Sequence, residues 1–234
     1  MSAKRAAEQL WLRPGTVRRV AIGPMRGLRF RISAQISTAR LRVFRSAYER
    51  EVVTWMCDYL QPGMTVLTVG AHVGIHAIHA ARLVAPNGHV HAFEPWPDNY
   101  RELLVNIEVN GGRIAPVTPI AVAVTRESGE AVMERGDGDG SHRLSPAGEI
   151  LVDAVTLDDY VAGLEPRGEV DLILVDAEGA EQDVLDGSVE TLAGASPALV
   201  LEHHEADEPL RLWLSLHDFV SERLGETHLA ARRR

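Results

Sequence analysis

The sequence has little of what disulfide-bonded, secreted or membrane-spanning proteins need. It contains one cysteine, Cys57, so no disulfide bond can form within the chain. No apolar run approaches the roughly 20 residues of a membrane-spanning helix, and the N-terminal residues lack the apolar core of a secretory signal. We therefore expect a protein of the reducing cytoplasm that has no membrane span.

Aromatic residues are also scarce, at 5% of the chain, and the charge is uneven. Residues 1–50 contain 12 of the 24 Lys and Arg residues but only two acids, Glu8 and Glu49, so they carry +10 while the rest of the chain carries −19. A basic arm of this kind is typical of contact with an anionic substrate, or of a hairpin that packs on an acidic body. It lacks the interleaved aromatic platform that binds single strands, so we expect no nucleic-acid partner.

The length of 234 residues fits one large domain with a well-buried core. Strand and helix patterns alternate along most of the chain, which predicts the α/β class. We expect residues 1–47 to form a basic extension with a β-hairpin and residues 48–234 to form the main domain. The glycine-rich, charged residues 125–155 are expected to be a hairpin or loop insertion in that domain.

The most informative pattern begins at residues 65–69, a short β-branched run typical of a buried parallel strand. Gly70 and Gly74 follow at once and predict a tight turn. Apolar residues then recur at helical spacing over 74–85, and the Pro-Asn-Gly sequence at 86–88 ends the helix. This order predicts the first half of a βαβ unit.

A second predicted strand at 89–93 completes the unit and delivers Glu94 to the carboxyl edge of the sheet, 24 residues after Gly70. In a right-handed βαβ unit the first turn and the end of the second strand are neighbours. A nucleoside can therefore lie between them, with its ribose hydroxyls bonded to Glu94.

The turn lacks the glycine fingerprint G-x-G-x-x-G of dinucleotide-binding proteins, because His72 stands at the second position. A pyrophosphate needs the close backbone approach that this denser glycine pattern allows. The turn therefore favours S-adenosylmethionine over a nicotinamide dinucleotide.

The same patterns place the remaining elements. They predict helices at 48–60, 99–109 (capped by Asp98), 157–161 (capped by Thr156) and 210–220, further strands at 117–124, 170–176 and 198–203, and for 221–234 a weak strand followed by a basic tail.

Three blocks of the sequence resemble the FkbM family of S-adenosylmethionine-dependent methyltransferases. They are VGAHVG with AFEP at 69–74 and 92–95, VDAEGAEQDVLDG at 175–187, and LVLEHH at 199–204. The resemblance implies a class I methyltransferase fold, Rossmann-like, with a mostly parallel seven-stranded sheet between helices. It also implies O-methylation of a hydroxyl group on a sugar or natural product.

The resemblance assigns cofactor contacts to the turn residues Gly70, Ala71 and Gly74 and to Glu94, and places Asp176 beside the sulfonium. His72 stands where the family usually has Asn and can still form a hydrogen bond there. Two further positions depart from the family pattern: Thr68 replaces a typical Asp, and Leu174 replaces a typical Lys.

The candidates for catalysis are Asp176, Glu178 and His204, which follow strands at the edge where ligands of open α/β sheets bind. His204 is favoured as general base by its ordinary pKa and Asp176 by its position. Glu178 and Glu181 open a helix, where carboxylates are equally expected for structural reasons. Asp176, Glu202 and His204 could also bind a divalent metal, but their spacing is not diagnostic and we predict no metal site.

His76 and His79 are interpreted as histidines on the surface of a helix. The leading hypothesis is an O-methyltransferase acting on a small-molecule or glycosidic hydroxyl. Two alternatives remain: a degenerate scaffold, in which Thr68 and Leu174 mark a decayed cofactor site, and a nicotinamide oxidoreductase.

Overall fold

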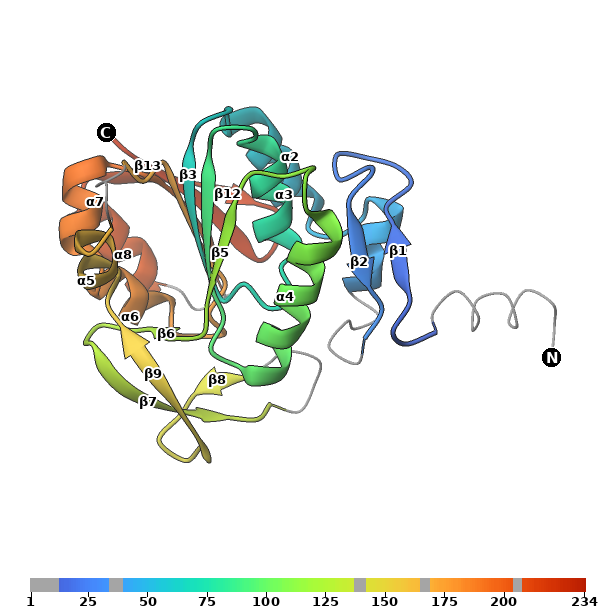
Figure 1. The fold of residues 1–234 in the computed structure, drawn as a ribbon. Coiled ribbons are helices and arrows are strands. Elements are labelled where there is room, and N and C mark those ends of the chain that lie inside the picture. The colour runs from blue at the N-terminus through green and yellow to red at the C-terminus, as the bar shows by residue number, and fades with distance from the viewer. Residues whose placement is uncertain (1–12, 34–39, 137–141, 165–168, 204–207) are drawn as a thin grey trace.

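A computed structural model describes residues 13–33, 40–136, 142–164, 169–203 and 208–234. Its main feature is a seven-stranded sheet flanked by helices, beside which an N-terminal hairpin packs (Figure 1). In spatial order the strands are β12 (Phe219–Leu224), β13 (His228–Arg233), β11 (Ala198–Glu202), β10 (Leu172–Val175), β3 (Thr65–Val69), β4 (His89–Phe93) and β5 (Val117–Ile120).

The five strands from β11 to β5 are parallel, and β13 alone runs antiparallel between β11 and β12. The predicted α/β class, the seven-stranded sheet and the hairpin are confirmed. The helices on one face are α2 (Arg50–Tyr59), α3 (Ile75–Leu83) and α4 (Pro97–Asn110); those on the other are α5 (Leu157–Ala162), α6 (Glu181–Asp186), α7 (Val189–Ala195) and α8 (Glu208–Leu216).

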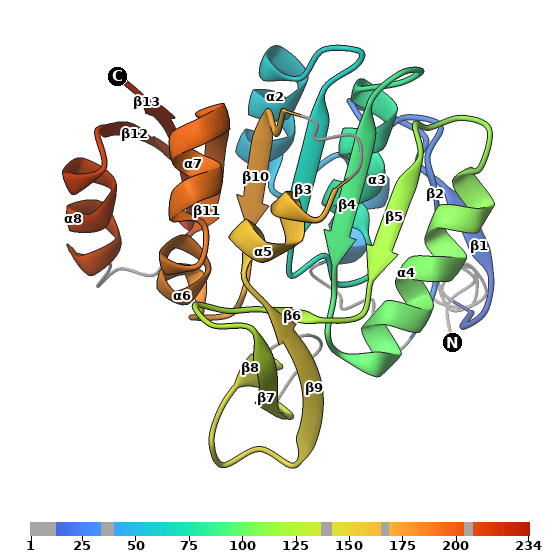
Figure 2. The same cartoon turned by 60° about the vertical axis from the view of Figure 1, so that its left-hand side comes forward.

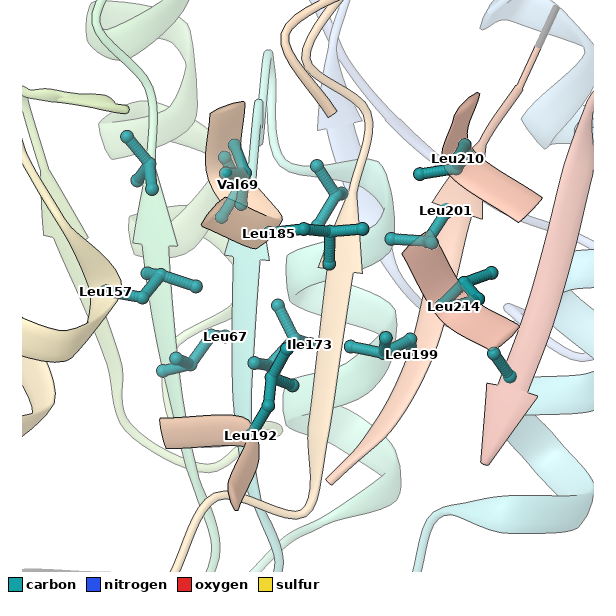
Figure 3. Packing of buried hydrophobic residues seen from close by; sticks show 14 of the residues in the cluster. Leu67, Val69, Leu157, Ile173, Leu185, Leu192, Leu199, Leu201, Leu210 and Leu214 are labelled. Atoms are coloured by element: carbon teal, nitrogen blue, oxygen red, sulfur yellow. The ribbon is translucent and has the colours of Figure 1, made fainter. Parts of the chain in front are cut away.

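Side chains alternate along each central strand between two hydrophobic cores. In β3, Val66 packs towards α2 and α3, whereas Leu67 and Val69 pack towards the opposite helices. Figure 3 shows this second core, in which strand residues such as Ile173 and Leu199 meet leucines of the covering helices. Burial on both faces explains why these strands are continuous apolar runs.

The C-terminal prediction for 221–234 is wrong. Instead of a weak strand and a basic tail, the chain forms the full hairpin β12–β13, and α8 ends at Leu216 rather than at 220. Leu229, Ala230 and Ala231 are buried against β11. The apolar run between Gly225 and the final arginines is too short to be recognised in the sequence, and long-range pairing makes it a strand.

The predicted strand at 117–124 divides between two sheets. Residues 117–120 form β5, while Ala123–Val124 (β6) pairs with Ile150–Val155 (β9) in a separate four-stranded sheet. Gly129–Glu134 (β7) and Arg143–Leu144 (β8) complete this sheet, which projects beyond the carboxyl ends of the main strands (Figure 2). The region expected as an insertion therefore lies over the edge where Glu94 ends β4.

Helix α4 turns a polar stripe towards the protein. Glu102, Asn106 and Asn110, each four residues from the next, are all buried, whereas the apolar Leu104 is 41% exposed. Asp98 does not cap this helix as predicted, since the N-cap residue is Trp96 and Asp98 pairs with Arg101. The spacing of apolar residues in the helix does not reveal this stripe, because the partners of the stripe are in the N-terminal hairpin, far away in the sequence.

The stripe attaches the N-terminal hairpin of Val17–Arg19 (β1) and Arg29–Arg31 (β2). Asn110 accepts a hydrogen bond from the Arg29 backbone N–H at 2.9 Å and donates one to the Arg29 carbonyl at 2.7 Å. Asn106 accepts one from the Arg31 N–H at 2.8 Å, and the Arg31 guanidinium pairs with Glu102. The side chains of α4 thus satisfy the free edge of β2 as a neighbouring strand would.

We predict that Asn110→Ala lowers the free energy of unfolding by about 2 kcal/mol, because the Arg29 N–H and carbonyl lose their partners. Urea unfolding measures the loss, and hydrogen exchange at the Arg29 amide is expected to accelerate. Glu108→Ala, an exposed change in the same helix, is the control and leaves both unchanged. Equal exchange rates in the two variants would contradict the role of Asn110.

Candidate functional site

The turn after β3 passes so close to the end of β10 that only glycine fits at its first position. Gly70 has φ +75°, and a Cβ atom there would lie 1.8 Å from the carbonyl oxygen of Asp176. The N–H groups of Gly70 and Ala71 both donate to the Phe93 carbonyl, at 3.0 and 2.8 Å. Gly74, φ +89°, then begins α3. The turn is therefore fixed between β4 and β10.

Glu94 lies behind this turn and is only 4% exposed. Its Oε2 accepts a hydrogen bond from the His72 backbone N–H at 2.7 Å, and its Oε1 accepts one from the Trp96 N–H at 2.8 Å. Burial raises the pKa of Glu94 to about 7, because desolvation outweighs the hydrogen bonds that favour the ionised form. One carboxylate thus holds the glycine turn and the loop after β4 together.

A cavity of about 60 Å³ lies beside Glu94. Its polar lining includes Gly70, His72, Asn99 and Asp176, and its apolar walls come from Phe93, Val122, Val124, Met133 and Leu144. Asn99 is buried, and within the described residues its Oδ1 has no hydrogen-bond partner. The site therefore combines an apolar slot with unused hydrogen-bonding capacity, as a nucleoside requires.

The four-stranded sheet closes this cavity on one side. The ring of His142 stacks on Trp96 with centroids 3.7 Å apart, and the Arg135 guanidinium lies 5.3 Å from the Trp96 ring centroid. The cavity is smaller than the roughly 300 Å³ at which small-molecule pockets begin. The cavity as it stands is therefore too small for a whole nucleoside.

Asp176 lies at the end of β10 and lines a second, smaller cavity as well as the first. This second cavity, of about 20 Å³, lies on the α2 and α3 side of the glycine turn. Tyr48, Thr68 and His76 are among its lining residues. Asp176 is therefore the carboxylate shared by both compartments.

Glu202, at the end of β11, forms a carboxyl pair with Asp176. Burial and the adjacent negative charge and hydrogen bond of Asp176 raise the pKa of Glu202 well above its ordinary value. The raised pKa favours the protonated form of the Glu202 carboxyl, as expected where two carboxyl groups lie close together. Glu181, in contrast, accepts hydrogen bonds from the N–H groups of Ala177 and Gly179, at 3.0 and 3.1 Å, and so stabilises the turn.

Glu178 has a left-handed backbone, with φ 50°, and lines the Glu94 cavity. His204, predicted at the same carboxyl edge of the sheet, lies outside the described residues. Within the described part of the chain, no group of three or more His, Cys, Asp or Glu residues is arranged to hold a metal ion.

A cluster that the sequence patterns did not reveal adjoins the second cavity. Glu49 precedes α2 and contacts two histidines: its Oε2 is 2.5 Å from Nε2 of His76 and 3.6 Å from Nε2 of His228. His76 and His79 are 8% and 0% exposed, so their interpretation as surface histidines is wrong. These residues come from three distant segments, and no local spacing links them.

The two departures from the family pattern are neighbours in the sheet. Thr68 of β3 lies directly opposite Leu174 of β10, and both are at least 98% buried. The Thr68 hydroxyl has no hydrogen-bond partner among the described residues. An Asp and a Lys at these positions would face each other, so this chain lacks both members of one potential ion pair.

The order of the strands, the single antiparallel strand β13, the glycine turn and the acid after β4 together define a Rossmann-like methyltransferase. The sequence comparison gives the family: residues 68–224 match the Methyltransferase FkbM domain. The chain belongs to the FkbM methyltransferase family, and its cofactor is S-adenosylmethionine.

Two methyltransferases are similar to this chain in sequence. Hexuronic acid methyltransferase AglP of Haloferax volcanii is 25% identical over 206 residues, which cover 87% of this chain and 82% of the relative. Protein-L-isoaspartate O-methyltransferase of Methanothrix thermoacetophila is 42% identical over 59 residues, covering 24% and 28%.

Solved structures share the fold. A methyltransferase FkbM from Methylobacillus flagellatus KT superimposes with a TM-score of 0.54 at 13% identity and covers 86% of this chain and 62% of its own. A precorrin-6y C5,15-methyltransferase from Geobacter metallireducens has a TM-score of 0.50 at 18% identity, covering 81% and 89%. No helix in the described ranges has the length and apolar character needed to cross a membrane.

The Glu49 carboxylate is expected to stabilise the fold, and this contribution is expected to be lost in acid. Burial alone would raise the pKa of Glu49, but His76, His228 and Tyr48 outweigh it and lower the pKa to about 2. Because this folded pKa lies below the ordinary value of 4.5, the contribution is complete above pH 4.5 and is lost as the pH falls towards 2.

We expect Glu49→Gln to lower the free energy of unfolding by about 3 kcal/mol at pH 7, and the difference from the unaltered protein to shrink between pH 4.5 and 2. Urea unfolding across this range measures it. Glu51→Gln, an exposed change in the first turn of α2, is the control. A difference for Glu49→Gln that does not vary with pH would refute the depressed pKa.

Proposed function

We propose that this methyltransferase transfers a methyl group to a hydroxyl of a sugar or related natural product, with a glycoside that contains a hexuronic acid as the first acceptor to test. The observation that carries the proposal is the position of Asp176, which lines both cavities. The resemblance to a hexuronic acid methyltransferase over most of both chains supports the sugar class.

The Glu94 cavity suits the nucleoside of the cofactor. The buried carboxylate of Glu94 would accept hydrogen bonds from two ribose hydroxyls, and Asn99 offers a buried carbonyl oxygen that has no partner within the described ranges. Gly70, Ala71, His72 and Gly74 would bring the turn's backbone against the amino-acid end. The apolar walls of the cavity would contact the adenine.

When bound, the cofactor supplies an electrophilic methyl group. The protein must align the acceptor oxygen with it and remove the hydroxyl proton. The raised pKa of Glu202 favours its protonated form, and the carboxylate of Asp176 would accept a hydrogen bond from an acceptor hydroxyl in the second cavity. We therefore assign Asp176 as the base and Glu202 as its positioning partner.

Two further residues complete the proposed site. Glu178 lines the cofactor cavity and would contact the cofactor or the near edge of the acceptor. His204 follows β11 in the sequence, two residues after Glu202, and remains the alternative base.

Glu94→Ala is expected to weaken S-adenosylmethionine binding by at least roughly 100-fold, because two hydrogen bonds to a charged group are lost and each is worth about 1.5–3 kcal/mol. It should also destabilise the fold, since the His72 and Trp96 N–H groups lose their acceptor. Calorimetric titration and thermal unfolding measure the two effects. Glu130→Ala, an exposed acid in β7, is the control; unchanged affinity in Glu94→Ala would remove the ribose role.

Asp176→Asn tests the proposed reaction itself. Radiolabelled methyl transfer to a glucuronic acid glycoside is expected to fall at least roughly 100-fold in kcat, the usual contribution of a general base, while S-adenosylhomocysteine affinity changes little. Asp153→Asn, an exposed change in β9, is the control. A product methyl group that mild alkali removes would be an ester on the carboxylate, and would contradict transfer to a hydroxyl.

A further inference from the structure

A third cavity, lined mainly by arginines, lies away from the proposed reaction site, beside the loop of the N-terminal hairpin. It has a volume of about 290 Å³. Five of its seven lining residues are arginines: Arg19, Arg26, Arg29, Arg82 and Arg113. None of the lining residues is acidic, although the whole chain has a net charge of −9. So many converging positive charges without a counter-charge are unfavourable unless an anion joins them.

One of the five arginines builds the cavity. Arg82, near the end of α3, is half buried, and its guanidinium donates hydrogen bonds to the carbonyls of Pro24 and Arg26. It therefore fixes the hairpin loop over the helix. The cavity has a defined wall and is not merely a group of surface side chains.

The other four arginines have no acidic partner among the described residues. Arg19 and Arg29 lie directly opposite each other on β1 and β2, an arrangement that is destabilising for like charges. Arg31, two residues further along β2, shows the contrast, because its guanidinium pairs with Glu102. Within the described ranges, Arg31, which anchors the hairpin, therefore has an acidic partner, and the four arginines that line the cavity beside Arg82 have none.

The cavity lies at the opposite edge of the sheet from Glu94. Arg82 is close to the C-terminal end of α3, whereas Gly74 stands at its beginning, and Arg113 precedes β5. A helix of nine residues spans about 14 Å. A ligand here cannot reach the Asp176 carboxylate with the same group, so this is a site separate from the reaction.

We propose that this five-arginine cavity binds the diphosphate group of a soluble ligand. Guanidinium forks match phosphate oxygens in a bidentate manner. A diphosphate, with several negative charges, neutralises more of the four arginines that lack an acidic partner in the described part of the chain than a single carboxylate would. The cavity is also far larger than one carboxylate needs.

Calorimetric titration with inorganic pyrophosphate tests the proposal. The full chain is saturated with S-adenosylhomocysteine, so that the other site is occupied, and the salt concentration is low and constant. The test variant is Arg19→Gln with Arg113→Gln, both at exposed positions. The control is Arg211→Gln with Arg223→Gln, which removes the same charge from exposed positions on α8 and β12.

We expect pyrophosphate to bind the unaltered protein, to bind the test variant at least roughly tenfold more weakly, and to bind the control variant within about twofold of the unaltered protein. Absence of binding, or equal weakening in both variants, would overturn the proposal. Co-sedimentation with phosphatidylcholine vesicles containing phosphatidic acid, without pyrophosphate binding, would also overturn it in favour of a lipid surface. Unchanged S-adenosylhomocysteine affinity in both variants verifies that the fold and the cofactor site are intact.

Discussion

The close approach of the Gly70 backbone to the carbonyl of Asp176 is the contact on which the site depends. A Cβ atom at Gly70 would lie 1.8 Å from that oxygen, so the ends of β3 and β10 meet only through glycine. Glu94 completes the arrangement from the other side by accepting the His72 and Trp96 N–H groups. As a result, Asp176 lines both the Glu94 cavity and the second cavity.

Much of this arrangement follows from local sequence patterns. Gly70, Gly74 and Glu94 occupy fixed places in a βαβ unit, because parallel pairing and right-handed crossover bring the ends of β3 and β4 together. The buried strands were equally predictable, since both of their faces are apolar. Thr156 caps α5 as expected, with its side chain accepting the Asp159 N–H. These features require only that neighbouring elements pack in the usual way.

The parts that could not be predicted all depend on contacts between distant segments. The strand β13 is stabilised by pairing with β11, and its short apolar run alone does not indicate a strand in the sequence. The buried polar stripe of α4 is explained by the backbone of β2. The cluster of Glu49, His76 and His228 is likewise visible only once three segments meet. In each case the structural role of a residue is set by a partner far away in the sequence, so neighbouring residues do not indicate it.

The glycine turn and Glu94 are proposed to bind S-adenosylmethionine and not a dinucleotide. Calorimetric titration of the unaltered protein with S-adenosylmethionine, and separately with NADH, tests it most directly. We predict micromolar binding of S-adenosylmethionine, about −8 kcal/mol, and no binding of NADH. Binding of NADH alone, or of neither ligand, would contradict it.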